Sequence, residues 1–350
     1  MNPRPSPLSV PLSGGASPLA RLRLVGVCTW RGGARAAYSI VHDDVGQPEA
    51  DGALDFGLPE LSQRRLRAGF ATVIGDIEAR GMWPRLATLV GDGHEILNHS
   101  WDHCNLVERP DYEAQIDRPQ ALAQRRLGAH APRLFAFPYD AYDEPAREHL
   151  RSRAFAGARA GERGVDVADA PADDFYLRYD TYGPDYSVYE EDVLNAHVDA
   201  AIESGGWAVR ELHGVEDQSW EMISRVDYAR HLDRLVEAGK TGRLWTDTPS
   251  VVAAYRRRRA EAGPCSLVEG ELRFDSARPS TVPSGDLSVE VEVDPAFALT
   301  AVQGGHEIEC RPLPQGVWRL ELDPYAGPTH LGTRSIGSRN YFSSRETSLS

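Results

Sequence analysis

The chain has 350 residues, of which 41% are hydrophobic and 26% charged, and its formal net charge is −14 at pH 7. This composition is typical of a soluble globular protein and excludes a disordered one. The length allows one large domain and a small one, each with a buried core. The acidic balance argues against a general binder of nucleic acid or anionic membranes, because both partners are polyanions.

The N-terminal sequence, MNPRPSPLSVPLSGGASPLARLRLVGV, lacks the basic region and the apolar stretch that follow one another in a signal peptide. No apolar run reaches the length of a membrane span. We therefore expect a cytoplasmic protein, with secretion as the alternative. The cysteines at 28, 104, 265 and 310 are too sparse for a disulfide framework, so reduced thiols are expected. Only Cys265 and Cys310 are candidates for pairing, in an exported chain.

From residue 22 onward, short apolar runs alternate with segments of helical periodicity. The runs predict strands at 21–30, 36–44, 70–77, 94–100, 134–140 and 207–214. Helices are predicted at 53–69, 82–93, 118–128, 144–157, 187–206 and 225–239, residues 244–263 are expected to form a short strand and a final helix, and residues 165–189 are expected to be irregular. This alternation predicts an α/β fold with a parallel sheet, either open or closed as a barrel.

Polar side chains follow the predicted strands at their carboxyl ends, where parallel α/β folds place their chemistry. They are Asp43 and Asp44, His99 and His103, Pro138 and Tyr139, and His213. This convergence is stronger evidence for a site than any one of the motifs.

After about residue 263 the pattern changes to alternating apolar and polar residues, as in DLSVEVEVD and VWRLELD, which is typical of strands with one wet face. We expect a flexible tail at 1–21, the main domain at 22–262, a small β-sandwich-like domain at 265–328 and a second tail at 329–350. The arginine run at 256–259 is expected to be a solvated helix face or a charge complement at the helix C-terminus, and not a nucleic-acid site.

His99 and His103 are four residues apart, which brings both imidazoles to one face if the segment turns helically. Two histidines and one carboxylate make a three-ligand site with open positions, the pattern of a catalytic metal. An isolated pair of this kind is more often two surface histidines. The aspartate pair at a neighbouring strand end favours the metal site instead.

Asp43 and Asp44 repel each other, so burying both needs a nearby cation. A divalent metal supplies one: one carboxylate can bind it while the other accepts a proton from water. A turn or a helix cap is the ordinary alternative for two adjacent aspartates.

The segments SIVHDD, GHEILNHSWDHCNL, FAFPYDAYD and RELHG resemble, in order and spacing, the polysaccharide deacetylases, also called the NodB homology or carbohydrate esterase family 4 enzymes. The resemblance covers about residues 25–260. It implies a distorted (β/α)7 barrel that binds a divalent metal, most often Zn²⁺, with Co²⁺, Ni²⁺ or Fe²⁺ as alternatives.

The resemblance also implies roles for individual residues. Asp44, His99 and His103 would bind the metal. Asp43 would be the general base, His213 the general acid, and the backbone N–H of Tyr139 would stabilise the oxyanion. Candidate substrate-binding residues are Pro138, Tyr139, Trp101 and Glu211.

The sequence departs from the family pattern at three places. Ala136 stands where the R-x-P-Y motif has an arginine, and no clear fourth motif is present, Asp180 being a weak candidate. His42 replaces an aromatic residue before the aspartates and is expected to be a packed or solvent-bridging histidine rather than an extra ligand. The period of two places Glu211 beside His213 on one strand face, where it could raise the pKa of His213; a partner on Arg210 or a neighbouring strand is the alternative.

We expect a metal-dependent hydrolase that removes an N-acetyl or N-acyl group from an amino sugar or oligosaccharide, with a small soluble substrate favoured. Two alternatives remain open. One is hydrolysis of a C–N bond in a cyclic imide or ureide on the same fold, and the other is a catalytically inactive carbohydrate-binding protein.

Overall fold

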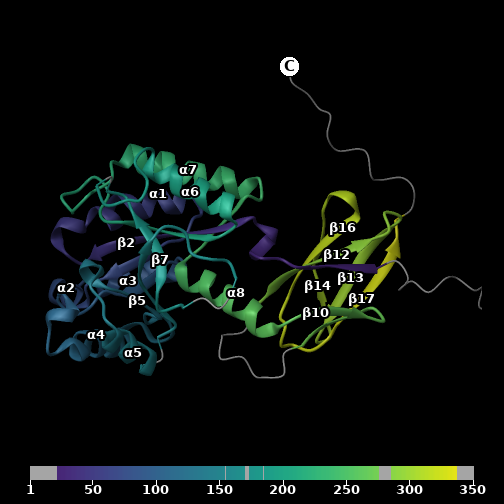
Figure 1. The fold of residues 1–350 in the computed structure, drawn as a ribbon, viewed down its shortest axis with the longest axis horizontal. Helices are drawn as coiled ribbons and strands as arrows, with labels where there is room; N and C mark the ends of the chain where they lie inside the picture. The colour runs from purple at the N-terminus through teal and green to yellow at the C-terminus, as the bar shows by residue number, and fades with distance from the viewer. Residues whose placement is uncertain (1–21, 154, 170–172, 184, 276–284, 337–350) are drawn as a thin grey trace, which may run out of the picture. The chain divides into compact units, whose positions relative to one another are not determined.

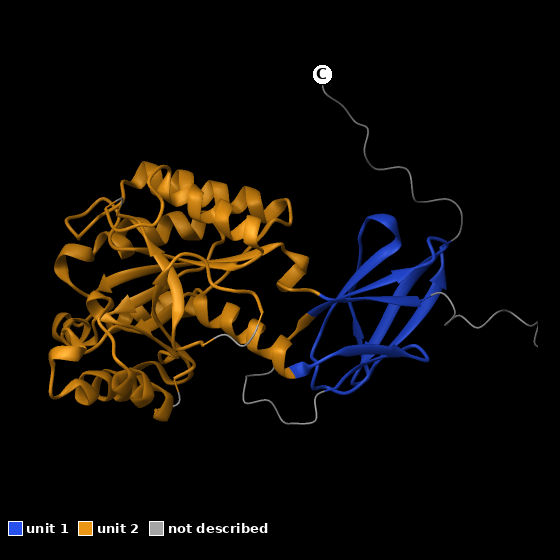
Figure 2. Cartoon of the chain, in the orientation of Figure 1, with its two compact units in different colours: residues 1–27, 262–279, 288–350 blue, residues 28–261, 280–287 orange. Residues whose placement is uncertain are grey.

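The computed structural model describes residues 22–153, 155–169, 173–183, 185–275 and 285–336. The chain divides into two compact units, one of residues 28–261 with 280–287 and one of residues 1–27, 262–279 and 288–350 (Figure 2). Among the described residues, no helix is both long and apolar enough to cross a membrane. The tail expected at 1–21, and residues 337–350 of the tail expected at 329–350, lie outside the described residues.

The larger unit is a closed barrel of seven parallel strands with one further strand beside it (Figure 1). Its strands are β2 (Ala36–Val45), β3 (Gly69–Thr72), β4 (Glu95–Asn98), β5 (Leu134–Ala136), β6 (Gly157–Arg163), β7 (Leu177–Thr181), β8 (Trp207–Leu212) and β9 (Leu244–Thr246). Strands β2 to β8 follow one another around the ring, and β8 pairs with β2 to close it. The expected (β/α)7 barrel is confirmed.

Strand β2 is the centre of this unit, and all ten of its residues are buried. One edge pairs with β8, and the other pairs first with β9, over Ala36–Tyr38, and then with β3. Side chains on both faces are buried because one face lines the barrel and the other lies under helices, which explains the unbroken apolar run before the aspartates.

In the described part of the chain, eight α-helices cover the barrel, and Figure 1 shows α1, α6 and α7 on one side with α4 and α5 on the opposite side. They are α1 (Leu58–Arg64), α2 (Ile74–Arg80), α3 (Trp83–Gly91), α4 (Tyr112–Leu127), α5 (Glu144–Ser152), α6 (Val193–Ser204), α7 (Arg225–Lys240) and α8 (Pro249–Ala262). Side-chain caps begin two of them: Asp143 accepts from the N–H of Ala146, and Ser224 from that of Asp227.

Two barrel strands were not predicted from the sequence. Strand β6 has the sequence GARAGER, without a β-branched or aromatic residue, and β7 lies in the region expected to be irregular. The expectation of a solvated face for the arginine run was wrong: Arg256 and Arg258 are buried, and Arg256 pairs with Asp166 and Asp174. Arg259 does lie in the last turn of its helix.

The smaller unit has two antiparallel sheets, in the orders β1-β12-β16-β15 and β10-β11-β17-β13-β14. The strands are β1 (Leu22–Val27), β10 (Cys265–Val268), β11 (Glu271–Phe274), β12 (Leu287–Val293), β13 (Phe297–Gln303), β14 (His306–Ile308), β15 (Cys310–Pro312), β16 (Val317–Leu322) and β17 (Thr329–Ser335). Apolar side chains from both sheets form its core, as expected for a sandwich.

Two segments differ from the expected boundaries. Residues 22–27, placed with the barrel domain, form β1 and pair antiparallel with β12. The alternation of half-buried and exposed residues in β1 suits a strand with one wet face, whereas the barrel strand β2 is buried throughout. Residues 329–335, placed in the tail, pair with β13 along their whole length through the backbone. None of the cysteines forms a disulfide, so Cys265 and Cys310 are not paired with each other.

Buried histidines make the barrel unit sensitive to acid. Burial lowers the pKa of His94 to about 4 and that of His231 to about 3, below the ordinary value of 6.5. The unfolded chain therefore binds more protons, and stability present above pH 6.5 is lost as the pH falls towards 3. Between pH 7 and pH 4, His231 alone should remove about 3 kcal/mol of the unfolding free energy.

Urea unfolding of wild type and His231→Gln at pH 7 and pH 4 checks this expectation. The variant should lose less stability between the two pH values, while the exposed His130→Gln control should behave as wild type. Equal losses in all three proteins would contradict it.

Candidate metal and catalytic site

Asp43 and Asp44 lie side by side at the end of β2, and both are buried. Neighbouring residues of a regular strand point to opposite faces. Here the pairing of β2 with β3 shifts register between His42 and Val45, and Asp44 has a φ of 61°. This bulge with a left-handed residue turns both carboxylates into the barrel mouth.

His99 and His103 come together in a loop after β4 rather than in a helical turn. Ser100 and His103 have φ values of 68° and 53°, and the Ser100 hydroxyl accepts a hydrogen bond from the backbone N–H of His103 at 3.0 Å. The two imidazole rings lie 4.9 Å apart. The expected pairing of the histidines is therefore present, but the local conformation that produces it is irregular.

The three expected metal ligands converge on one carboxylate oxygen. Oδ1 of Asp44 lies 2.9 Å from Nε2 of His103 and 3.4 Å from Nε2 of His99. Their ligand atoms lie within 4.8 Å of one another. Burial would raise the pKa of Asp44, but the two imidazoles outweigh it and hold that pKa below its usual range.

A hydrogen bond at Nδ1, on the side of the ring away from Asp44, fixes the orientation of His99. Its Nδ1 lies 2.8 Å from the backbone oxygen of Ala136, which accepts the Nδ1 proton and leaves Nε2 aimed at Asp44. This is the arrangement that a metal-binding histidine needs.

Arg159, from the unpredicted strand β6, lies beside Asp43 and was missed by the sequence interpretation. Its guanidinium contacts Asp43 and Glu211 through different nitrogens, and the arginine is 2% exposed. Arg159 pairs in register with Ala136, the position of the absent family arginine. A guanidinium therefore reaches Asp43 from the adjacent strand.

His213 faces the other oxygen of Asp44, with its Nε2 3.8 Å from Oδ2. Burial lowers the pKa of His213, although the carboxylates of Asp43 and Asp44 oppose this shift. The expectation that Glu211 raises the pKa of His213 is wrong, because the Glu211 carboxylate pairs with Arg159 instead. The alternative, a partner on Arg210 or a neighbouring strand, is not what the structure has either, because Arg159 lies on β6, which β7 separates from β8.

These side chains line a cavity of about 560 Å³. Its lining comprises Asp43, Asp44, Gln47, Glu49, His99, His103, Phe137, Tyr139, Asp140, Arg159, Arg163, Tyr186, Glu211, His213, Gln218 and Trp220. Of the four expected substrate-binding residues, Tyr139 and Glu211 are in it. Trp101 and Pro138 are not: Trp101 packs under the guanidinium of Arg118, 3.4 Å from its ring centroid, and Pro138 is buried.

Two further residues considered in the sequence, His42 and Asp180, do not line the cavity and contact other side chains instead. His42 is packed, as expected: it is fully buried, lies against Phe70 and contacts the hydroxyl of Tyr228 at 2.9 Å. Asp180 is not part of the site, because it pairs with Arg210 at 3.2 Å and accepts from Ser187.

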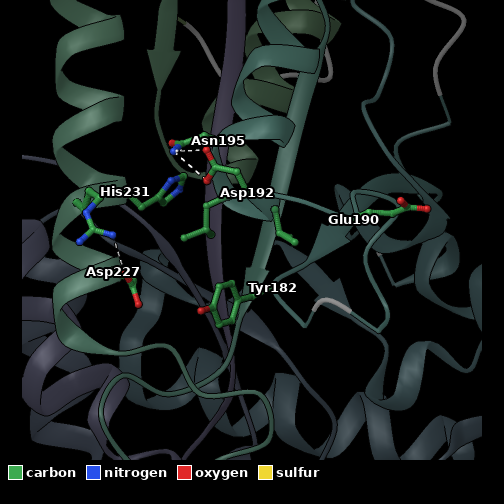
Figure 3. A pocket seen from close by; sticks show the side chains of 9 residues that line it. Tyr182, Glu190, Asp192, Asn195, Asp227 and His231 are labelled. Carbon is green, nitrogen blue, oxygen red and sulfur yellow. Dashed lines mark hydrogen bonds and ion pairs between the residues drawn. The ribbon is translucent and has the colours of Figure 1, made fainter.

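A second cavity of about 340 Å³ lies beside the start of α6 and α7 and contains none of the expected site residues (Figure 3). It is lined by Tyr182, Glu190, Asp192, Val193, Leu194, Asn195, Asp227, Arg230 and His231. Asp227 pairs with Arg230 and Asp192 accepts from Asn195, so these carboxylates already have partners within the wall.

Residues 43–157 match the family described as polysaccharide deacetylase. No curated protein matches the chain. A putative polysaccharide deacetylase from Mycobacterium smegmatis is similar in structure, with 18% identity, a TM-score of 0.49, and coverage of 74% of this chain and 99% of that one.

Two other solved structures are similar. Peptidoglycan deacetylase PdaC from Bacillus subtilis has 16% identity and a TM-score of 0.42, with 65% of this chain and 94% of that chain covered. A family 4 carbohydrate esterase from Streptomyces lividans, in complex with acetate, has 18% identity and a TM-score of 0.40, with 61% and 92% covered.

The family match spans the segment that contains both aspartates and both histidines of the cluster. Over residues 43–157, the chain is therefore similar to the polysaccharide deacetylase family.

Proposed function

We propose that this protein is a metal-dependent deacetylase that hydrolyses the N-acetyl or N-acyl amide of an amino sugar or a short oligosaccharide. The observation that supports it most is the meeting, at one cavity, of a two-histidine, one-carboxylate cluster with a second carboxylate and a third histidine. These are the groups needed to hold a divalent cation and to move two protons.

The donor set fits a divalent metal. Oδ1 of Asp44 is buried and accepts no properly oriented hydrogen bond among the described residues, although two imidazole nitrogens lie close to it. A cation between these atoms would satisfy all three, and nitrogen and oxygen donors of this kind suit Zn²⁺ and related ions. Asp44, His99 and His103 would hold the metal, whose chemistry is Lewis-acid polarisation of the amide carbonyl.

Asp43 is suited to the role of general base. Its Oδ2 is engaged by Arg159, whereas its Oδ1 is buried and has no hydrogen-bond partner among the described residues. One oxygen is therefore held in place and the other remains open to take a proton from the attacking water.

His213 is suited to the role of general acid. It lines the same cavity and faces the other oxygen of Asp44, so its protonated imidazolium form can give a proton to the leaving amine while Asp43 receives the proton from water. Tyr139 sits at the cavity in a left-handed conformation, with a φ of 57°, and we propose that its backbone N–H binds the developing oxyanion.

The structure weakens one argument for the ureide alternative. That alternative depended on the missing arginine of the R-x-P-Y motif, but Arg159 supplies a guanidinium to Asp43. A distorted site would favour the alternative of an inactive binding protein. No such distortion supports it, because all five groups line one cavity: Asp43, Asp44, His99, His103 and His213.

Acetate release from N-acetylglucosamine oligomers, measured together with bound metal, tests the proposal. We expect wild type to contain or take up one divalent metal and to release acetate, and Asp43→Asn to release it about 10²–10⁴-fold more slowly, the usual contribution of a general base. The variant should keep its metal. Asp55→Asn, at an exposed ion pair, is the control and should match wild type. Metal without acetate from any amino sugar would shift the assignment to another C–N bond, and absence of metal uptake would support an inactive binder.

A further inference from the structure

Two consecutive residues in the turn after β5 have left-handed backbone conformations. Tyr139 has a φ of 57° and Asp140 has a φ of 54°. Residues other than glycine avoid this region, so two of them in succession persist only where the surrounding structure holds them. The turn that carries the backbone N–H of Tyr139 therefore needs a restraint.

The backbone of this turn does not supply that restraint by itself. The N–H of Asp140 donates to the oxygen of Phe137 at 3.2 Å, and the N–H of Ala141 donates to that of Pro138 at 3.1 Å. These hydrogen bonds close the turn on itself. The Asp140 carboxylate connects it to the barrel, because it accepts a hydrogen bond from Nη2 of Arg163, the last residue of β6, at 2.9 Å.

Arg163 is itself held by a buried aromatic ring. Its guanidinium carbon lies 4.2 Å from the ring centroid of Tyr179, which pairs with Arg163 in register on β7 and is 1% exposed. The guanidinium carbon of Arg159 lies 4.6 Å from the same ring centroid. One fixed ring therefore supports two arginines, one beside the proposed base Asp43 and one beside the turn.

A surface ion pair without influence on the site is the ordinary alternative. The Arg163 and Asp140 side chains are 24% and 34% exposed, whereas those of Arg178 and Glu162, an ion pair on the same two strands, are 43% and 64% exposed. Solvent screens the first pair less than the second. Arg163 and Asp140 also line the 560 Å³ cavity, and Arg178 and Glu162 do not.

We infer that the ion pair of Arg163 with Asp140 is a positioning device, which holds Tyr139 in its left-handed conformation and so fixes its backbone N–H for the oxyanion before substrate binds. Neither side chain needs to touch the reacting atoms. An oxyanion donor acts mainly in the transition state, where the negative charge develops, so loss of the ion pair lowers kcat more than it changes KM. This inference rests on the proposed function and deepens it.

Acetate release from N-acetylglucosamine oligomers by the full-length, metal-loaded protein tests the inference. Complete loss of an oxyanion donor costs about 10²–10³-fold in kcat, so Arg163→Met and Asp140→Asn, which only loosen the donor, should each lower kcat about tenfold and leave KM within about twofold. Asparagine tolerates the left-handed conformation as aspartate does, so Asp140→Asn removes the charge alone. The double variant should be no slower than the slower single variant, because both changes remove one interaction. Arg178→Met is the matched control and should equal wild type.

Amide hydrogen exchange over residues 139–142, measured by mass spectrometry, reports on the turn without any substrate. Exchange should be about fivefold faster in Arg163→Met and in Asp140→Asn than in wild type, because a turn that opens more often exposes its N–H groups. Arg178→Met should exchange as wild type does. Metal uptake should be the same in all these proteins, since none of the changed residues belongs to the proposed ligand set.

The outcomes separate this inference from the proposed function. Unchanged exchange over 139–142, a raised KM with unchanged kcat, or effects that multiply in the double variant would each overturn the inference and leave the function standing. Faster exchange in both variants, without acetate release by wild type, would support the hold of the ion pair on the turn and overturn the proposed function.

Discussion

Replacing Arg159 with methionine is expected to destabilise the protein by about 3–5 kcal/mol and to remove most of the proposed deacetylase activity. The guanidinium pairs with both Asp43 and Glu211, and all three side chains are nearly fully buried. Without it, two carboxylates remain in the barrel mouth with no cation between them. Urea unfolding gives the stability, and acetate release gives the activity.

Two further variants test whether the guanidinium group of Arg159, and not only its positive charge, is required. Arg159→Lys keeps the charge but cannot bridge two carboxylates as a guanidinium does, so an intermediate stability is expected. Combining Arg159→Ala with Ala136→Arg should recover part of both losses, because residue 136 is the register neighbour of residue 159.

The matched control for these variants is Arg178→Met on the neighbouring strand. Arg178 pairs with Glu162 at 2.8 Å, but both side chains are exposed, so the change should cost less than about 1 kcal/mol. If Arg159→Met were as stable as this control, the buried bridge would not be holding the two carboxylates in place.

Replacing His103 with glutamine is expected to weaken metal binding by more than about 100-fold, since loss of an outer hydrogen-bond partner alone costs about 10–100-fold. Only one imidazole and one carboxylate would remain of the proposed ligands. Because a metal that binds only the folded state stabilises it, wild type should gain about 2.7 kcal/mol at a Zn²⁺ concentration 100 times the Kd. The variant should gain almost nothing at the same concentration.

Thermal unfolding with and without added Zn²⁺ measures this effect without reference to any substrate. His130→Gln, at an exposed histidine, should retain the full Zn²⁺-dependent increase in Tm. An equal increase in His103→Gln would mean that the stabilising metal binds elsewhere, and would contradict the proposed ligand set.

Much of the site followed from local patterns. The buried run before Asp43, the spacing of His99 and His103, and the alternation ending at His213 predicted strand ends that meet at one edge of the barrel. Such patterns are informative because burial on both faces of a parallel strand demands an apolar run, and the polar residue after it marks the mouth.

Other features depended on contacts between distant segments. Strand β6 forms from glycine, alanine and charged residues, which have no strand preference of their own, because β5 and β7 offer it backbone partners on both sides. Arg159 was therefore not recognisable as a site residue, although it replaces the arginine missing at position 136. The proposed reaction requires a positive charge beside Asp43, and a strand other than the expected one can supply it.

Local sequence thus determined the strand ends, the aspartate pair and the histidine pair, because burial and residue spacing leave periodic signals. Only the tertiary structure decided that a bulge turns both Asp43 and Asp44 inward. It also decided that Glu211 forms an ion pair with Arg159 instead of acting on His213, and that residues 22–27 join the smaller unit. Each of these depends on a partner far away in the chain, whose free energy of pairing outweighs local preference.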